Sequence, residues 1–341
     1  MTETVESDPA SRLFPTTAPL PAGVVLRHLR APDDFHDMNT MANAIRRAEG
    51  TDFSTTDEQF ARFYADPPGS DPTTDVAVAE IDGQIVGYGR AAWHEELTGI
   101  RIYEVIPFLD PALAGSELFV ALVEALEARD RMIAADHPAG EKHFETFGGD
   151  LAPERDALLR AHGYEPVRYF YSMLRPTLDD LPDAPLPDGL EIREVHPEHL
   201  PAIWAADQEA FRDHWGFAPG TDGDYERFVS DPVTADSSLW RIAWDGDEVA
   251  GQVRSFINEE ENERLGRLVG HTESISVRRP WRRRGLARAL IAASFPLLRA
   301  RGMTQAALGV DTQNPSGALR VYEACGFVPI SRTTTYRKPL T

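Results

Sequence analysis

The chain of 341 residues contains two halves that follow the same pattern. In the first half the β-prone segments 76–81 and 84–89 are separated by the dipeptide Asp82-Gly83, and in the second half the segments 239–244 and 247–252 are separated by Asp245-Gly246. Asp-Gly between two such segments predicts a hairpin, because a type I′ turn needs positive φ at both central residues. A hairpin at the same place in both halves constrains each half to a similar sheet.

A second landmark strengthens the repeat. Gly163-Tyr164 in the first half corresponds to Gly326-Phe327 in the second, and both landmarks are 163 residues apart. Each half has a helical region (35–47; 199–211), the hairpin, a strand, a long amphipathic helix, a strand, a short helix and a last strand. We therefore predict the α/β class, as an α+β mixed sheet with helices on both faces, in two tandem domains.

Proline and glycine mark the boundaries. Residues 176–189 carry four prolines and repeated aspartates, so this segment cannot continue a helix or a central strand and predicts a semi-rigid linker. Residues 1–22 are polar and rich in proline, which is typical of a flexible leader. The predicted domains are therefore 23–175 and 190–341.

The formal net charge of −21 argues against a nucleic-acid-binding surface, since the chain would repel the phosphate backbone. No run approaches the eighteen or so apolar residues of a membrane helix, and the acidic N-terminus lacks the features of a signal peptide. The single cysteine, Cys325, fits a reducing compartment. We expect a cytoplasmic protein that binds no nucleic acid, no membrane and no metal.

One basic segment stands out against the acidic background. Five arginines occupy seven positions between residues 278 and 284, directly after the β-prone segment 274–277 and before a predicted helix from Leu286 to Arg301. Gly285 and the small Ala287 allow the backbone to approach a ligand, and a helix N-terminus favours a pyrophosphate. The residues alone therefore predict a phosphate-binding loop. A solvated basic helix start, or an RNA contact, remains an alternative.

The same residues resemble a known family. Residues 277–287 resemble the acyl-CoA loop of the GNAT N-acetyltransferases, Arg/Gln-x-x-Gly-x-Gly/Ala after a valine-rich strand, with Arg282, Gly285 and Ala287 at its fixed positions. Downstream, the run from Asn314 to Phe327 resembles the second signature of the family. The two-domain layout resembles the tandem, mycothiol synthase-like acetyltransferases, in which the C-terminal copy is active.

The resemblance implies acetyl-CoA as co-substrate. It also implies that the strand ending at Val277 separates from its neighbour, so that the pantetheine pairs with its backbone. The residues expected to bind the cofactor lie on this strand, on the loop and helix start, and at the second signature: Ile275, Ser276, Val277, Arg282, Arg283, Arg284, Gly285, Leu286, Ala287, Arg288, Asn314, Ser316 and Tyr322.

The resemblance further implies direct attack of an amine on the thioester in a ternary complex. Tyr322 matches the tyrosine that protonates the leaving thiolate. The family often places a glutamate base on the strand before Val277, where His271 and Glu273 share one face. Both remain candidates for the base, with Glu273 favoured because a carboxylate also holds a cationic substrate.

Substrate contacts are expected from residues 207–217 and from the loop after Phe256. The first region offers charge and an aromatic wall, and the second offers three consecutive glutamates, which a solvated loop explains equally well. The side chains concerned are Asp207, Glu209, His214, Trp215 and residues 259–261.

The first half resembles the family only in outline. With Val105 aligned to Val277, an aspartate and a leucine replace the key residues of the loop, and the 163-residue offset replaces the acid by a leucine. The replacing residues are Asp110 for Arg282, Leu113 for Gly285, Gly115 for Ala287 and Leu159 for Tyr322. We therefore predict a degenerate first copy.

The leading hypothesis is an enzyme that acetylates a primary amine of a small molecule. A peptide or protein N-acetyltransferase and a non-catalytic acyl-CoA-binding module are the alternatives. The sequence leaves the acceptor and the oligomeric state open, a homodimer included.

Overall fold

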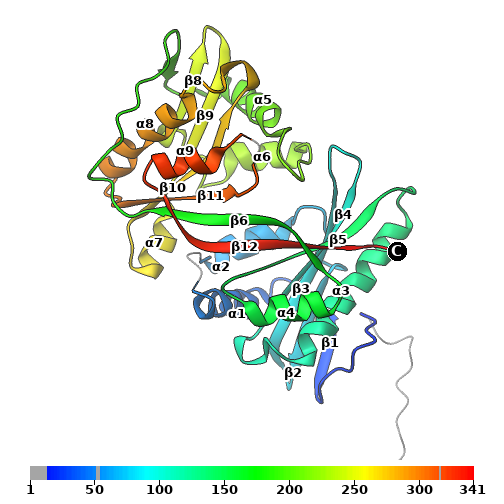
Figure 1. Ribbon diagram of the computed structural model, residues 1–341. Helices are drawn as coiled ribbons and strands as arrows, with labels where there is room; N and C mark the ends of the chain where they lie inside the picture. The colour runs from blue at the N-terminus through cyan, green and yellow to red at the C-terminus, as the bar shows by residue number, and fades with distance from the viewer. Residues whose placement is uncertain (1–13, 51–53, 315) are drawn as a thin grey trace, which may run out of the picture. The chain divides into compact units, whose positions relative to one another are not determined.

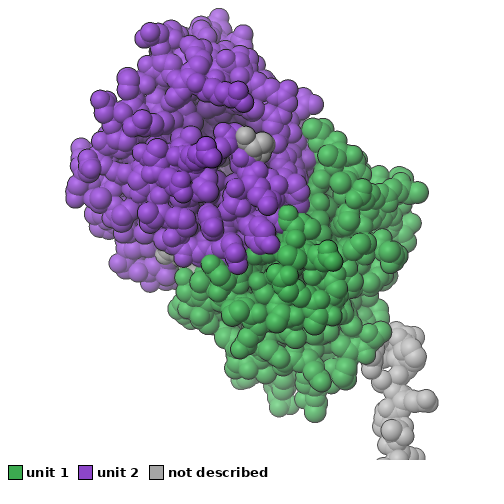
Figure 2. Space-filling view, viewed as in Figure 1, with its two compact units in different colours: residues 1–167, 334–341 green, residues 168–333 purple. Residues whose placement is uncertain are grey.

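The computed structural model describes residues 14–50, 54–314 and 316–341. Contacts within the chain divide it into two compact units (Figure 2). Unit 1 comprises Met1–Val167 and Thr334–Thr341, and unit 2 comprises Arg168–Thr333. Each unit is a mixed sheet with helices, as Figure 1 shows, which confirms the predicted fold class and the two tandem domains.

Unit 1 contains a sheet in the order β1-β2-β3-β4-β5, in which only the pair β4–β5 is parallel. The last residues of the chain join this sheet beside β5, where Leu340 N donates to Lys142 O at 3.0 Å. The elements are β1 (Val24–His28), α1 (Phe35–Ala48), α2 (Asp57–Ala65), β2 (Val76–Ile81), β3 (Gln84–Glu95), β4 (Arg101–Leu109), η2 (Pro111–Leu113), α3 (Glu117–Ala135), β5 (Lys142–Gly149) and α4 (Pro153–Ala161).

Unit 2 contains a sheet in the order β6-β11-β10-β9-β8-β7, in which the pair β10–β11 is parallel. Its elements are β6 (Glu165–Arg175), β7 (Glu191–Arg193), η3 (Pro197–His199), α5 (Leu200–Phe211), α6 (Asp222–Ser230), η4 (Ser237–Leu239), β8 (Trp240–Asp245), β9 (Glu248–Phe256), α7 (Glu259–Leu265), β10 (Val269–Val277), η5 (Arg279–Trp281), α8 (Leu286–Ala300), β11 (Gln305–Asp311), α9 (Ala318–Ala324) and β12 (Val328–Pro339).

Helices cover both faces of the sheet in unit 2. One apolar cluster joins α8 to the sheet through Leu290, Phe295 and Leu298, all without exposed surface, and a separate cluster lies between α5 and strands β8 and β9. Helix α8 continues past Pro296 to Ala300. Among the described helices of both units, none is long and apolar enough to cross a membrane.

Two strands change units along their length. β6 begins in unit 1, but its residues from Arg168 onward belong to unit 2, where Phe170 to Arg175 pair with β11. β12 does the reverse, since Thr334 and the residues after it belong to unit 1. Contacts therefore place residues 168–175 in unit 2 and residues 334–341 in unit 1, whereas the sequence assigned each to the other domain.

The predicted leader and linker also contact their units. Residues 1–13 of the leader lie outside the described residues, but Phe14 is buried in the core of unit 1, and the Glu124 carboxylate accepts hydrogen bonds from residues 16–18. In the linker, Leu178 is buried against unit 2, and its N–H donates to Thr304 O at 3.0 Å. Composition alone did not reveal these apolar anchors.

Candidate active site

The site in unit 2 begins where two parallel strands separate. β10 and β11 pair from Val269 only as far as His271, opposite Ala307, although β10 continues to Val277 and β11 to Asp311. The separation implied by the resemblance is therefore present. It leaves backbone groups of both strands available to a ligand beside residues 275–277.

A β-bulge lies in the part of β10 that pairs with β9 but no longer with β11. Glu273 pairs with Arg254 and Ser276 with Gln252, so two residues of β10, Ser274 and Ile275, lie opposite one residue of β9. Ser274 has φ of +48°, a left-handed conformation that costs a non-glycine residue roughly 1–2 kcal/mol. A bulge leaves its extra residue outside the hydrogen-bond ladder and changes the direction of the side chains that follow it. The side chains of β10 after Ser274 therefore point in other directions than those of a regular strand.

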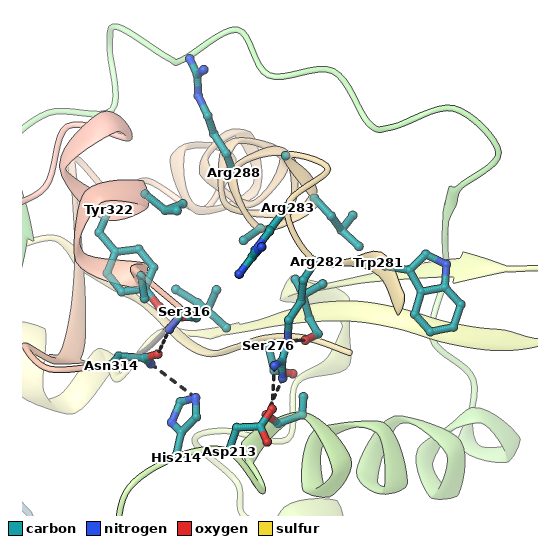
Figure 3. A pocket seen from close by; sticks show the side chains of 18 residues that line it. Asp213, His214, Ser276, Trp281, Arg282, Arg283, Arg288, Asn314, Ser316 and Tyr322 are labelled. Carbon is teal, nitrogen blue, oxygen red and sulfur yellow. Dashed lines mark hydrogen bonds and ion pairs between the residues drawn. The ribbon is translucent and has the colours of Figure 1, made fainter. Parts of the chain in front are cut away.

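A cavity of about 610 Å³ opens beside this strand (Figure 3). It is within the range of ligand sites of small molecules and cofactors. It is lined by β10, the arginine loop, the start of α8, α9 and the segment after α5: Ala210, Asp213, His214, Ile275, Ser276, Val277, Trp281, Arg282, Arg283, Gly285, Leu286, Ala287, Arg288, Asn314, Ser316, Ala318, Val321 and Tyr322.

The structure thus gathers most of the predicted cofactor residues around one space. Of that set only Arg284 does not line the cavity; its guanidinium donates to Asp188 O at 3.3 Å. Two of the predicted catalytic residues, Glu273 and His271, also lie outside the lining, on β10 before the bulge.

The loop before α8 presents a helix N-terminus to the cavity. Gly285 is the N-cap residue, with φ of +83° and no side-chain cap, so the first N–H groups of α8 have no side-chain acceptor. Arg283 also has a positive φ, +62°, and its side chain points into the cavity (Figure 3). Free helical N–H groups next to a guanidinium suit a phosphate, as the sequence predicted.

Arg282 has a different environment from Arg283. Its guanidinium donates to Val277 O at 2.9 Å and Ala210 O at 3.1 Å, and it forms an ion pair with Asp213 at 2.6 Å. Arg279 also pairs with Asp213, and hydrogen bonds from both arginines hold the pKa of that carboxyl far below its usual value. Arg282 therefore ties the loop to β10 and α5. Asp213 lies within the predicted substrate region 207–217 but was not among the side chains named there, and its pairing with Arg282, 69 residues away, was not predicted.

Glu273 spans the gap between the separated strands. Its Oε1 accepts a hydrogen bond at 3.1 Å from the N–H of Gly309 on β11. Burial raises the pKa of Glu273 to about 7, although the charge of His271 and the Gly309 hydrogen bond act in the opposite direction. A carboxyl with this pKa exchanges its proton near neutral pH, as a general base must.

Tyr322 faces the cavity from α9 and is only 6% exposed (Figure 3). Burial raises its pKa, and the nearby Glu273 carboxylate raises it further. The phenol therefore keeps its proton at neutral pH. The two groups lie close enough for the charge of one to influence the proton of the other.

His271, the second candidate base, has other contacts. Its ring stacks on Phe256 with a centroid distance of 4.7 Å and an interplanar angle of 6°, and its Nε2 lies 3.6 Å from Glu261 Oε1. Glu261 is buried and also pairs with Arg267, so the predicted acidic loop at 259–261 is a helix with one inward-facing glutamate. These contacts occupy His271, whereas Glu273 contacts β11 at the separation of the two strands.

The predicted substrate contacts separate into two groups. His214 lines the cavity, where burial lowers its pKa and its Nε2 lies 3.4 Å from the Asn314 amide nitrogen. Asp207, Glu209 and Trp215 do not line it. Their contacts lie elsewhere: Asp207 is buried against β9 and β10, Glu209 pairs with Arg278, and Trp215 lies under the Arg168 guanidinium.

Strand registers identify the equivalent positions in unit 1. Gly251 of β9 pairs with Val277, and Gly87, at the same distance from its own hairpin, pairs with Leu109. The predicted equivalence of Val105 and Val277 is therefore wrong, since Leu109 takes that place. Leu109 lies four residues after Val105, and the bulge of β10 does not explain this error, since its extra residue shifts the equivalence by only one position.

The two hairpins also differ, by one position. Asp82 and Gly83 are the central turn residues in unit 1, with φ of +48° and +80°, as predicted. In unit 2 the turn consists of Gly246 and Asp247, since Asp245 still pairs with Glu248. The two Asp-Gly dipeptides therefore lie one position apart in the fold, although each is part of an equivalent hairpin.

The corrected alignment keeps unit 1 degenerate. Ile106, opposite Arg90, takes the place of Glu273, opposite Arg254. The loop before the long helix is one residue shorter and lacks the arginines, and the alignment of the short helices is as predicted. The replacements are Ala114 for Arg282, Ser116 for the N-cap Gly285 and Leu159 for Tyr322.

These features define the class of protein: an N-acetyltransferase with separated parallel strands, a glycine-capped helix beside a basic loop, and a buried tyrosine at the junction. Residues 200–327 match the family described as "Acetyltransferase (GNAT) family". The chain belongs to the GNAT family, in its tandem-domain form.

Its relatives include proteins named mycothiol acetyltransferase. One from Salinispora arenicola is 27% identical over 331 residues, covering 95% of this chain and 99% of the relative. Another from Thermobispora bispora is 30% identical over 210 residues, covering 61% of this chain and 70% of the relative.

Solved structures with the same fold also span both units. The GCN5-related N-acetyltransferase from Sphaerobacter thermophilus has a TM-score of 0.72 and 25% identity, covering 94% of this chain and 97% of that one. A tandem GNAT protein from the clavulanic acid biosynthesis pathway has a TM-score of 0.63 and 17% identity, covering 93% and 98%, and this likeness concerns the fold alone.

Proposed function

We propose that unit 2 transfers an acetyl group from acetyl-CoA to a primary amine of a small molecule, by direct attack in a ternary complex. The observation that carries this proposal is the pair Glu273 and Tyr322 at the separation of β10 and β11, beside a cavity of about 610 Å³. A base and an acid next to one ligand space are what the two proton transfers of the reaction need.

The described residues fit the two ends of acetyl-CoA. The uncapped N–H groups of α8 and the inward-pointing Arg283 would hold the pyrophosphate. The backbone of residues 275–277, which has lost its pairing with β11, would pair with the pantetheine arm. The bulge before Ser276 would direct the thioester toward Tyr322.

The proton transfers follow from the two pKa values. Glu273, whose pKa is about 7, takes the proton of the ammonium, directly or through a water molecule, and leaves a neutral amine. The amine nitrogen bonds to the acetyl carbon and the carbon–sulfur bond breaks. Tyr322 donates its phenolic proton to the thiolate, which leaves as free CoA. The second proton of the attacking nitrogen passes to the tyrosinate, directly or through a water molecule, so that a neutral amide is released and the phenol is restored.

The charge of Glu273 influences the pKa of Tyr322. The carboxylate of Glu273 raises the pKa of Tyr322, so the tyrosine holds its proton before the reaction. Once Glu273 has accepted the proton of the amine its charge is gone, and the pKa of Tyr322 falls. Deprotonation of the nucleophile thus makes Tyr322 a better acid when the thiolate forms.

The cavity lining and the related proteins both bear on the identity of the acceptor. His214 and Asn314 line the cavity with polar groups, and burial lowers the pKa of His214. Relatives with nearly the same length carry the name of a small thiol compound, mycothiol, which supports a small-molecule acceptor without identifying it here. A peptide acceptor and a binding module without turnover are the competing outcomes of the test.

The test is release of free thiol from acetyl-CoA across a panel of small primary amines, peptides with a free N-terminus and peptides with lysine. We expect turnover above the hydrolysis rate with at least one small amine. Turnover with peptides alone would replace the small-molecule acceptor by a peptide. Tight binding of acetyl-CoA without turnover of any acceptor would leave a binding module and overturn the proposal.

A further inference from the structure

The bulge of β10 is contacted by a buried polar network from another element. Asp207 of α5, 7% exposed, accepts hydrogen bonds on Oδ1 from Gln252 Nε2 at 2.5 Å and from Ser276 Oγ at 3.2 Å. Gln252 and Ser276 are the pair that closes the bulge on its Val277 side. Asp207 therefore joins β9 and β10 by hydrogen bonds at one end of the bulge.

Arg254 holds the other end. In the register of β9 and β10, Arg254 lies opposite Glu273. Its Nη2 donates to Ser274 Oγ at 2.6 Å and to Asp207 Oδ2 at 3.2 Å. Its guanidinium lies over the rings of Phe228 and Trp240, at 4.8 and 5.6 Å from their centroids. Stacking and two acceptors fix the guanidinium in one place, with its donor aimed at the residue of positive φ.

Unit 1 shows that the fold does not need this network. At the equivalent register positions, Tyr88 and Phe108 replace Gln252 and Ser276, and their rings stack at a centroid distance of 4.8 Å. There β3 and β4 pair continuously, without a bulge. Arg90, which occupies the place of Arg254, donates to Pro68 O instead. In unit 1, stacked rings are enough to hold β3 and β4 together. The buried ion pair of Asp207 and Arg254 in unit 2 is therefore not needed for stability, and another role must explain it.

We propose that Asp207 and Arg254 are positioning residues, which hold Ser274 in its left-handed conformation and so keep the bulge in the shape that orients the thioester. This proposal rests on the proposed function. Neither side chain lines the cavity, so neither contacts the cofactor; they act through Ser274 and Ser276. Loss of the network would let Ser274 leave its left-handed conformation and the bulge change its shape, while the phosphate-binding loop stays intact.

The test compares Arg254→Met and Asp207→Asn with the wild-type protein. We expect kcat to fall at least about tenfold in Arg254→Met, with KM for acetyl-CoA and the Kd of CoA within about threefold, because the loop and the N-terminus of α8 are untouched. Asp207→Asn keeps the volume and two acceptor contacts, so its kcat should fall less. If Arg254→Met fails to fold, Arg254→Lys is measured in its place, with the same expectation of a lower kcat and a nearly unchanged Kd of CoA.

A second substitution separates positioning from mere stability. Glycine adopts the φ of +48° without the hydroxyl contact, so Ser274→Gly in the Arg254→Met background should restore at least several-fold of the lost kcat. The matched control is Arg90→Met, a buried arginine at the same register position of unit 1, which should lower thermal stability but leave kcat unchanged.

Three outcomes would overturn the positioning role: unchanged kcat in Arg254→Met, an equal loss of CoA binding, or no rescue by Ser274→Gly. If the wild-type protein turns over no amine, the proposed function fails separately. The network is then tested by amide hydrogen exchange of the peptide that contains residues 272–277. Faster exchange in Arg254→Met than in Arg90→Met would support it, and equal exchange would refute it.

Discussion

The strands β4 and β10 share one frame and differ where the chemistry would occur. Both leave their parallel neighbour at the same register position, β4 after Glu104 and β10 after His271. Beyond that point β10 has a bulge, a carboxyl group with a raised pKa and a basic loop. β4 has continuous pairing, Ile106 and a loop without arginine.

The cavities differ in the same sense. Unit 1 keeps a cavity of about 220 Å³ at the corresponding end of β4, against about 610 Å³ in unit 2. Arg155, the one arginine among the described residues that line it, pairs with Glu49 at 3.0 Å, and Glu117 lies in the first turn of α3, where a phosphate would approach. The separation of strands is therefore common to both units, whereas the bulge, the basic loop and the buried tyrosine at the short helix are features of unit 2, to which we assign the proposed function.

The largest effect should come from Tyr322→Phe, which removes the acid and makes α9 resemble α4 with its Leu159. We expect kcat to fall about 10²–10³-fold, as general acids contribute, while acetyl-CoA binding changes little. Initial rates and calorimetric titration measure both quantities. The control is Tyr164→Phe, a buried tyrosine of unit 1. A Tyr322→Phe enzyme with wild-type kcat would remove the acid role.

Glu273→Gln should lower kcat about 10²-fold and change the pH profile. The base must be ionised, so the wild-type rate should rise with pH through about 7 and then level off. The variant should lose this limb, because glutamine does not titrate. Glu104→Gln on β4 is the control. A limb that persists in Glu273→Gln would transfer the base role to another group, with His271 the first to test.

Gly285→Val should weaken acetyl-CoA binding at least about tenfold, because a β-branched residue at φ of +83° costs roughly 1–2 kcal/mol and covers the N–H groups of α8. Gly302→Val offers a matched control at the other end of α8, with φ of +84° and no contact for an added Cβ. Calorimetric titration of both variants measures the difference. Equal binding by the two would contradict the loop assignment.

The smallest effect concerns unit 1 alone. Asp130 has no exposed surface, both its carboxylate oxygens lack a hydrogen-bond partner among the described residues, and burial raises its pKa well above the usual value. A raised folded pKa means that stability is full below pH 4 and declines as pH rises toward the folded pKa.

Asp130→Asn should therefore raise the free energy of unfolding at pH 8 by on the order of 1 kcal/mol and flatten its decline from pH 5 to 8. Thermal unfolding at both pH values, with the exposed Asp136→Asn as control, measures this. An unchanged decline in Asp130→Asn would mean that another group causes it. Unchanged kcat is expected, since Asp130 belongs to the unit without the site.

Much of the site was readable from short-range patterns. Arg282, Gly285 and Ala287 lie in the loop and the first turn of α8, and Asn314 and Tyr322 lie in the turn before α9 and on α9, so local sequence sufficed to place each of them. The contacts of Arg282 with Asp213 and of Glu273 with Gly309 could not be predicted, because each joins elements that only the folded sheet brings together.

The alignment of the two halves shows the same limit. The repeated dipeptides gave the correct architecture, but they placed both Asp-Gly pairs at one turn position, and the separate alignment of Val105 with Val277 was wrong as well. One residue in a bulge or a loop changes every later equivalence, because side chains of a strand alternate between faces. Only the register of the hydrogen-bonded pairs corrects it.

The sequence by itself determined the repeat, the class of fold, the glycine-capped basic loop and the tyrosine of the second signature, since each depends on residues near one another in the chain. The tertiary structure decided which unit each terminal strand completes, the bulge at Ser274, the raised pKa of Glu273 and the buried network of Asp207 and Arg254. These depend on burial and on contacts between distant segments, and local sequence encodes neither.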